Sequence, residues 1–285
     1  RFGTTAGSNS ALGSCALYTN TTGDGNVGIG ANSLKANTTA SSNTAVGFDS
    51  LVSNTTGVHH VAVGQGAARC NTTGACNTAL GSDAMERLLT GNQNTGVGRL
   101  AGKGNTDGDG NTYLGFVAGC NITTGCYNTY VGAETGSSSA TVLFEQVFGR
   151  GGTGKGSGTF FSSSSANGVF NTANATAWSQ TSDRRIKKNI VNNNTGLDKI
   201  NQIQVRDFEY RTKDEVTDFE NVETAYVDKS GVQIGVIAQE IETIFPEMII
   251  TQTTGVKTFN PEKLTFYLIN AIKELKKEID LLKNK

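Results

Sequence analysis

Hydrophobic and polar positions recur along the first half of the chain with a period of 17 residues. Each copy has a branched aliphatic residue in its fourth position and glycine in its fifth, and the consensus reads N-T-A-V-G-x-x-A-L-x-x-N-T-T-G-x-x. Such short apolar runs between Asn, Thr and Gly predict strands of about four residues joined by tight turns, whereas helices need longer runs of period 3.6 and little glycine. The copies begin at Asn9, Asn26, Asn43, His60, Asn77, Asn94, Asn111 and Asn128.

One copy holds too few apolar atoms to build a core of its own. Stacked copies place each fourth-position side chain over the next at a spacing of about 4.8 Å, which builds a continuous narrow core. We therefore predict a β-solenoid, or β-roll, of eight 17-residue repeats over residues 1–136. The ninth position shrinks from Leu17 through Ala68 to Gly102, so we expect the core to narrow toward its C-terminal end or neighbouring chains to approach there.

The repeats resemble the head repeats of trimeric adhesins, with which they share the unit N-x-A-V/I-G. The similarity covers residues 9–136, although the period of 17 residues is longer than is usual in that family. The resemblance implies a left-handed parallel β-roll that associates in threes.

Residues 137–181 lose this period and become rich in Ser and Gly. They still contain apolar patches such as Val142-Leu143-Phe144 and Phe160-Phe161, which a disordered linker is expected to lack. We predict a β-rich connector that covers the open edge of the solenoid.

Charge separates the first 181 residues, which carry 16 charged side chains, from the remaining 104, which carry 33. Both prolines, Pro246 and Pro261, also lie in the second part, so residues 182–285 form a different domain. A short amphipathic helix is predicted from Ala238 to Phe245, ended by Pro246, with Ile241 and Ile244 facing inward.

A last helix is predicted to follow Asn260, which is a suitable cap before Pro261. Its apolar residues alternate at spacings of four and three, which is typical of a two-heptad coiled-coil seam. The members of this seam are Leu268, Ile272, Leu275, Ile279 and Leu282. The heptads alone do not distinguish two strands from three.

The domain boundary carries the sequence T-S-D-R-R-I-K-K-N-I, from Thr181 to Ile190. Taken alone, it is typical of a solvated basic run or a nuclear-localisation patch. It also resembles the S-D-x-R-x-K-x-N-I opening of the endosialidase-type C-terminal intramolecular chaperone domain of phage tail fibres and tailspikes, which also occurs in some eukaryotic membrane-bound transcription factors. The resemblance continues through Gly235–Glu240, Phe245–Glu247 and Ala271–Leu275, and covers residues 182–285 in order.

In that family the domain folds and trimerises the β-structure before it and then cuts itself off immediately before the motif serine. The resemblance implies that the scissile bond is Thr181–Ser182, that Ser182 is the nucleophile and that Lys187 is the base. A serine hydroxyl needs a positioned base, and lysine serves as one only when it is neutral. Burial near other cations, with Arg184, Arg185 and Lys188 as candidates, would favour neutral Lys187. Asp183 is a further candidate, for orienting the turn.

We therefore expect the distal part of a trimeric viral tail fibre or spike, located on the virion or another extracellular surface. The alternative is a non-cleaving trimerisation module of a cell-surface adhesin. A glycan-degrading enzyme is disfavoured, because no paired carboxylates stand out in the repeats. The chain opens inside repeat sequence at Arg1, so we expect it to be the C-terminal piece of a longer polypeptide.

The expected partners are two further copies of the chain and a host-surface receptor or glycan. A net charge of −1 offers no field for nucleic acid, and no apolar stretch of about 18 residues predicts membrane insertion. No cofactor and no metal site are expected. The five cysteines match no metal or redox spacing, so we expect free thiols filling small sites, with Cys70–Cys76 and Cys120–Cys126 bridges as an open alternative.

Overall fold

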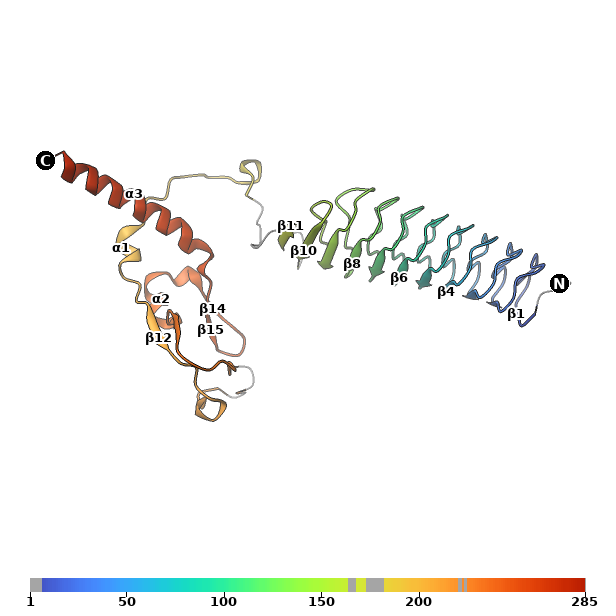
Figure 1. The fold of residues 1–285 in the computed structure, drawn as a ribbon, viewed down its shortest axis with the longest axis horizontal. Coiled ribbons are helices and arrows are strands. Elements are labelled where there is room, and N and C mark those ends of the chain that lie inside the picture. The colour runs from blue at the N-terminus through green and yellow to red at the C-terminus, as the bar shows by residue number, and fades with distance from the viewer. Residues whose placement is uncertain (1–6, 164–167, 173–181, 220–221, 223–224, 285) are drawn as a thin grey trace. The chain divides into compact units, whose positions relative to one another are not determined.

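The computed structural model describes residues 7–163, 168–172, 182–219, 222 and 225–284. The chain divides into two compact units, residues 1–183 and 184–285, and each is described by itself. Figure 1 shows the regular stack of coils in the first unit and the long final helix α3 of the second.

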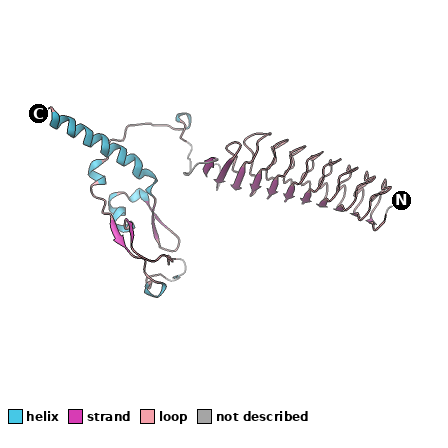
Figure 2. Ribbon diagram, in the orientation of Figure 1, coloured by secondary structure: helices cyan, strands magenta, loops and turns pink. Residues whose placement is uncertain are grey.

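The first unit is a β-solenoid, as predicted. One short strand from each coil joins a single sheet, and strands β1 to β10 pair in parallel with their neighbours (Figure 2). The strands are β1 (Ser10–Leu12), β2 (Val27–Ile29), β3 (Thr44–Val46), β4 (Val61–Val63), β5 (Thr78–Leu80), β6 (Thr95–Val97), β7 (Thr112–Leu114), β8 (Thr129–Val131), β9 (Gln146–Gly149), β10 (Thr159–Ser163) and β11 (Gly168–Thr172). Successive copies pair without slippage, with Ser10 opposite Val27 and Thr112 opposite Thr129.

The sheet continues beyond residue 136, where the repeat had been expected to end. Glu145 takes the place of the first-position Asn, Val131 pairs with Phe148, and Gly149 has the positive φ, 116°, of the fifth-position glycines. Strand β10 then adds to β9, and β11 closes this edge by pairing antiparallel to β10. The residues predicted as a connector thus first complete the eighth coil and then form a ninth from Glu145, which the Phe-Gly pair 17 residues after Val131-Gly132 could have revealed.

The interior is lined by the third and ninth positions of each copy, and not by the fourth. Alternation along a three-residue strand turns the third side chain inward, as at Ala45 and Tyr113, and the fourth outward, as at Leu12 and Leu114. Leu12 is 70% exposed and Leu114 is 46% exposed. The predicted core of stacked fourth-position aliphatics is therefore wrong.

The expected narrowing of the core is also absent, because the third position compensates for the ninth. Where the ninth position falls to Gly102 and Gly119, the third position grows to Tyr113 and Tyr130, and both rings are fully buried. The two rings stack with their centroids 5.9 Å apart. The tyrosine rings thus occupy interior space beside the glycines of the ninth position.

Buried asparagines join one coil to the next through their side-chain amides, which both donate and accept. The Asn111 backbone N–H donates to Asn94 Oδ1 at 2.9 Å, and the Asn111 side-chain N–H donates to the Gly125 carbonyl at 2.8 Å. A second ladder runs through Asn20, Asn37, Asn54 and Asn71. These ladders satisfy buried turn backbone, which explains why Asn recurs where an apolar residue would leave polar groups unpaired.

The second unit is small and mixed in secondary structure. Its elements are η1 (Arg184–Ile186), α1 (Leu197–Ile200), β12 (Arg206–Phe208), η2 (Lys213–Glu215), β13 (Gln233–Gly235), α2 (Ala238–Ile244), η4 (Pro246–Met248), β14 (Ile249–Thr251), β15 (Lys257–Phe259), η5 (Pro261–Lys263) and α3 (Leu264–Lys283). Two antiparallel pairs, β12 with β13 and β14 with β15, accompany the helices. The α+β class and the long C-terminal helix are confirmed.

The core of this unit forms around α2 and η4, as the sequence predicted for Ile241. Ile241, Phe245 and Met248 are buried, and the Tyr267 ring of α3 meets the Phe245 ring edge-on with centroids 4.7 Å apart. The Asn260 side chain accepts a hydrogen bond from the Glu262 backbone N–H at 3.0 Å, so the predicted cap is present. No helix in the described part of the chain is long and apolar enough to cross a membrane.

All five cysteines are free thiols, so neither of the two alternative bridges forms. Cys15, Cys76 and Cys120 are exposed and the other two are partly exposed. The expected free thiols are therefore present, but none of the five is fully buried.

Candidate cleavage site

The predicted cleavage motif spans the residues at which one structural unit ends and the next begins along the chain. Ser182 and Asp183 are the last residues of the first unit, and Lys187 belongs to the second. Thr181, on the other side of the predicted scissile bond, lies outside the described residues. The pairing of Ser182 with Lys187 stays a prediction.

The motif residues of the second unit form a single helical turn on the surface. Arg184–Ile186 make the 3-10 turn η1, and the Lys187 backbone N–H donates to the Arg184 carbonyl at 3.2 Å. Asn189 then adopts the left-handed conformation with φ 53°, which turns the chain. Lys187 is exposed in the single chain, so the burial expected to favour its neutral form is not supplied there.

Helix α3 holds the segment that follows this motif. The Asn270 side-chain N–H donates to the carbonyls of Asn193 at 2.9 Å and of Thr195 at 3.0 Å. Glu274 Oε2 accepts a hydrogen bond from the Leu197 backbone N–H at 2.7 Å. The segment leading away from the predicted cleavage site therefore ends at a fixed point on the last helix.

Gly196 lets α1 and α3 come together at this fixed point (Figure 1). A Cβ built on Gly196 would lie 2.4 Å from the backbone nitrogen of Ala271, closer than any side chain could fit. Ala271 is itself buried. These contacts explain the Ala271–Leu275 part of the resemblance. Ala271 packs against Gly196 and Glu274 binds the Leu197 backbone, so both residues hold the segment that follows the motif.

The other segments that carry the resemblance hold the domain together. Gly235 lies in β13, where a Cβ would meet the Phe208 ring at 3.2 Å. Glu240 on α2 pairs with Arg206 on β12, with Oε1 and Nη2 2.9 Å apart, and this hydrogen bond raises the pKa of the guanidinium. These contacts tie β12 and β13 to the helix that carries the core.

The Phe245-Pro246-Glu247 segment is tied to α3 through Tyr267. The Tyr267 hydroxyl donates to Glu247 Oε1 at 3.0 Å, next to the ring contact with Phe245. The pKa of Glu247 is lowered, first by a hydrogen bond from its own backbone amide and then by that from Tyr267. Sequence reasoning missed Tyr267, Asn193 and Asn270, because each contributes through a contact with a distant segment.

A groove of about 810 Å³ in the second unit lies away from the motif. Its mixed lining includes the aromatic residues Phe208, Tyr210, Phe219 and Phe259. Neither Ser182 nor Lys187 lines it. Among the described residues, no group of three or more His, Cys, Asp or Glu side chains is placed to hold a metal ion.

Comparison with protein families finds a match in the second structural unit and at its boundary. Residues 182–250 match the family described as the chaperone of endosialidase, which also carries a peptidase name. The match begins at Ser182, the residue at which the composition changes. This match supports the endosialidase-type chaperone domain that the motif predicted. No curated protein and no solved structure matches the chain.

Proposed function

We propose that residues 182–285 assemble three copies of the chain and then release themselves by hydrolysing the Thr181–Ser182 bond. One observation carries this proposal, the start of the chaperone family match at Ser182. The remaining solenoid would be the distal part of a trimeric viral tail fibre or spike. Its place would be the virion or another extracellular surface, where a host receptor or glycan would be its target.

The cleavage would proceed through an ester. The Ser182 Oγ attacks the carbonyl carbon of Thr181 while Lys187 takes the hydroxyl proton, and the C–N bond breaks as the Ser182 nitrogen is protonated. Water then hydrolyses the ester, which leaves a carboxylate on Thr181 and frees the Ser182 hydroxyl at a new N-terminus. Each chain does this once, so the activity is processing and not turnover.

The exposure of Lys187 supports an order in which assembly comes first. A lysine accepts a proton only when it is neutral, and desolvation favours that form. Lys187 is exposed in the single chain, so we expect further copies or a rearrangement of η1 to cover it before it acts. Cleavage after assembly would keep the chaperone attached until its work is complete.

Helix α3 supports the assembly step. Its seam residues are well exposed in the single chain, with Ile272 at 65% and Leu282 at 69%. A helix normally buries such a stripe against a partner. The number of three copies comes from the family resemblance and not from the heptads.

A second candidate is a non-cleaving trimerisation module of a cell-surface adhesin. It is favoured by the same observation that Lys187 is exposed, because an unassembled or relic site would look like this. The two candidates share the fold and differ only in chemistry.

The test is the intact mass of the purified chain beside the variants Ser182→Ala, Lys187→Ala and Lys229→Ala. Lys229 is the control, since it is an exposed lysine of the same unit that lies outside the motif. We expect the wild type and Lys229→Ala to split, with a fragment that begins at Ser182, and the other two variants to stay whole. Four intact but multimeric proteins would favour the non-cleaving module, and cleavage of Ser182→Ala would exclude the serine mechanism.

A further inference from the structure

The outward face of the solenoid sheet carries an unbroken row of apolar side chains. We call this row the fourth-position stripe. Its members are Leu12, Ile29, Val46, Val63, Leu80, Val97, Leu114, Val131 and Phe148. Each lies opposite the next in the parallel register, and all are exposed or partly exposed, with Val63 at 38% and Leu114 at 46%. The stripe crosses nine coils without interruption.

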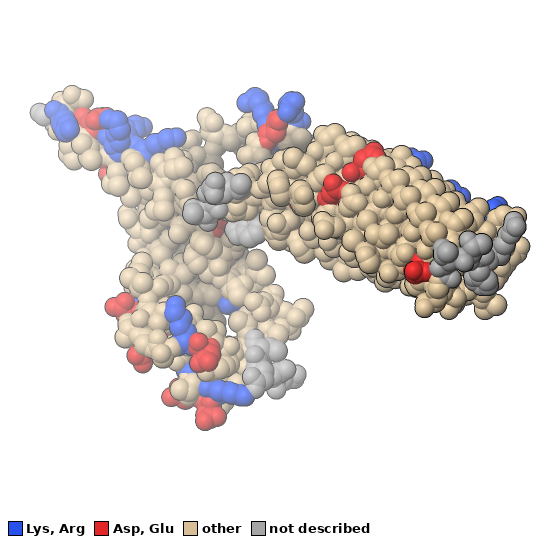
Figure 3. All heavy atoms as spheres, turned by 45° about the vertical axis from the view of Figure 1, so that its right-hand side comes forward, with Lys and Arg blue, Asp and Glu red and all other residues tan. Residues whose placement is uncertain are grey.

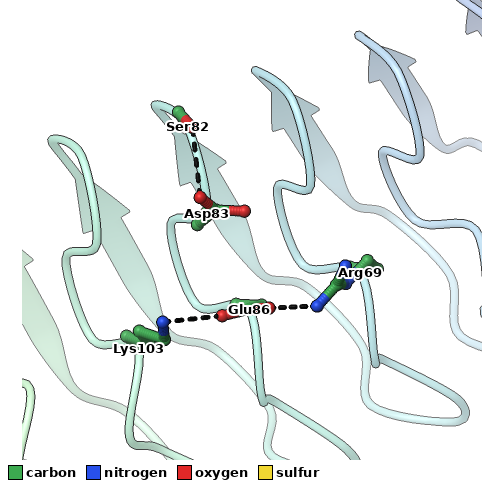
Figure 4. A network of polar contacts seen from close by, with 5 residues as sticks. All are labelled: Arg69, Ser82, Asp83, Glu86 and Lys103. Carbon is green, nitrogen blue, oxygen red and sulfur yellow. Dashed lines mark hydrogen bonds and ion pairs between the residues drawn. The ribbon is translucent and has the colours of Figure 1, made fainter.

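No charged residue lies among the outward positions of these nine strands. The second positions beside the stripe are Ser10, Val27, Thr44, Val61, Thr78, Thr95, Thr112, Thr129 and Gln146. Charges gather instead on the loops, where Glu86 of one coil pairs with Arg69 of the preceding coil and with Lys103 of the following one (Figure 4). The solenoid surface visible in Figure 3 is mostly uncharged, with a few charged side chains near its edges.

The area of the stripe is typical of an interaction site but is too small for a stable interface on its own. With strands about 4.8 Å apart it is about 38 Å long and about 10 Å wide, an area of about 400 Å². Patches of this size are typical of interaction sites, but a stable interface buries about 800 Å² on each partner. A contact of this kind suits chains that something else has already brought together.

A second copy of this chain fits the stripe better than a globular partner does. Another copy offers the same branched side chains at the same spacing, so contacts can repeat on every coil when the chains lie parallel and in register. An uncharged face set against its own copy also leaves no charge buried without a partner. A globular protein has no such period to match.

We propose that the fourth-position stripe is the surface along which copies of this chain pack side by side in the assembled solenoid. The inference rests on the assembly role proposed above and adds the surface that the chaperone domain would bring together. It also accounts for an aliphatic residue in every fourth position, although that position faces away from the interior of the coil.

Photo-cross-linking in the full chain tests the stripe directly. Benzoylphenylalanine is placed at Val63, which is 38% exposed, or at Leu89, a turn residue that is 39% exposed and lies off the stripe. We expect position 63 to cross-link to stripe peptides of another copy, and position 89 not to do so. The result does not depend on cleavage, because mass spectrometry identifies the joined peptides in cleaved or intact chains.

A matched pair of charge variants gives the second readout. Val63→Lys and Leu89→Lys place the same charge at sites of nearly equal exposure. The solenoid of a single chain should therefore fold with either substitution. We expect Val63→Lys to weaken association of the cleaved solenoid by about tenfold or more, and Leu89→Lys to leave it unchanged. Circular dichroism of both variants checks that the solenoid is folded.

The outcomes separate this inference from the proposed function. Multimers whose position 63 cross-links to no other copy, or to a different molecule, overturn the stripe and leave the assembly role standing. A wild type that is monomeric and uncleaved overturns both. A cleaved chain whose solenoid is monomeric overturns the stripe alone.

Discussion

The ring of Tyr113 fills the space that a side chain at Gly102 would occupy. A Cβ built on Gly102 would lie 2.4 Å from Cδ2 of Tyr113, and one on Gly119 would lie 2.3 Å from Cδ1 of the same ring. At Gly96 the sizes are reversed, with glycine in the third position and the large Met85 in the ninth. A Cβ built on Gly96 would lie 2.9 Å from Cγ of Met85. The third and ninth positions thus share one interior volume, and a large residue in one requires a small residue in the other.

The substitution Gly102→Ala tests this shared volume. The residue has φ 62°, so alanine carries both the cost of the left-handed conformation, about 1–2 kcal/mol, and that of displacing the ring, about 1–3 kcal/mol. Gly151→Ala is the control, because Gly151 has φ 63° with nothing within 4 Å of its Cβ position. We expect the free energy of unfolding of the solenoid to fall clearly further in Gly102→Ala. Equal losses of unfolding free energy in the two variants, measured by chemical denaturation, would show that displacing the Tyr113 ring costs little.

Two buried tyrosines are expected to respond in opposite directions when their hydroxyls are removed. Within the described part of the chain, Tyr113 Oη has no hydrogen-bond partner, whereas the Tyr130 hydroxyl donates to Glu145 Oε2 at 2.9 Å. Tyr113→Phe removes an unsatisfied buried group and should be neutral or stabilising by about 1 kcal/mol. Tyr130→Phe should cost about 1–3 kcal/mol, because Glu145 loses a donor. The thermal midpoints of the two variants, compared with that of the wild type, measure these effects. A lower midpoint for Tyr113→Phe would contradict the view that its hydroxyl is unsatisfied.

Stability of the solenoid should fall as the pH drops below 6.5, because of His60. This residue replaces Asn in the ladder: its Nδ1 accepts from the Asn77 backbone N–H at 3.2 Å, and its Nε2 lies 2.6 Å from the Gly74 carbonyl. Burial lowers the pKa of His60 from 6.5. Between the lowered folded pKa and 6.5, the unfolded chain binds the proton and the folded chain does not, so the proton favours unfolding by about 1.4 kcal/mol per pH unit.

The variant His60→Asn restores the residue of the other copies and should remove this part of the pH dependence. Its Oδ1 can accept the same backbone N–H, as Asn94 Oδ1 does from Asn111. The exposed neighbour provides the control His59→Asn, which should keep the pH dependence because His60 stays buried. Thermal midpoints at several pH values between 8 and about 4.5 measure the effect. A pH dependence that persists unchanged in His60→Asn would assign it to other groups.

Loss of the Asn270 side chain should slow cleavage without preventing assembly. This amide holds the carbonyls of Asn193 and Thr195, the fixed point from which the chain leads back to Lys187. Asn270→Ala should lower the cleavage rate about tenfold, since a displacement of about 1 Å far from the reacting atoms can cost as much as a hundredfold. Lys276→Ala, on the same helix but 75% exposed and paired with Asp280, serves as the control. Equal cleavage rates in both variants would remove Asn270 from the positioning of the site.

The pattern along the chain was sufficient to predict the parts of the fold that depend on local or strictly repeated residues. An unbroken period places copies in parallel register, so the β-solenoid followed from spacing alone. The Asn260 cap, the short helix ended by Pro246 and the long last helix each depend on a few neighbouring residues, whereas the seam on that helix stays a prediction. The start of the chaperone domain at Ser182 was visible as a change in charge and in the motif that begins there.

Only the tertiary structure decided which side of each strand faces the interior. Third-position Ala and fourth-position Val are both apolar, so composition does not say which of them faces inward; in the fold the third position does, whether it holds Ala62 or Tyr113. The coil is too narrow for two large side chains at one level, so the volume left by Gly102 goes to Tyr113 from the next copy. The exposure of Lys187 likewise depends on what packs around it, and that is a property of the folded and assembled chain which no local pattern encodes.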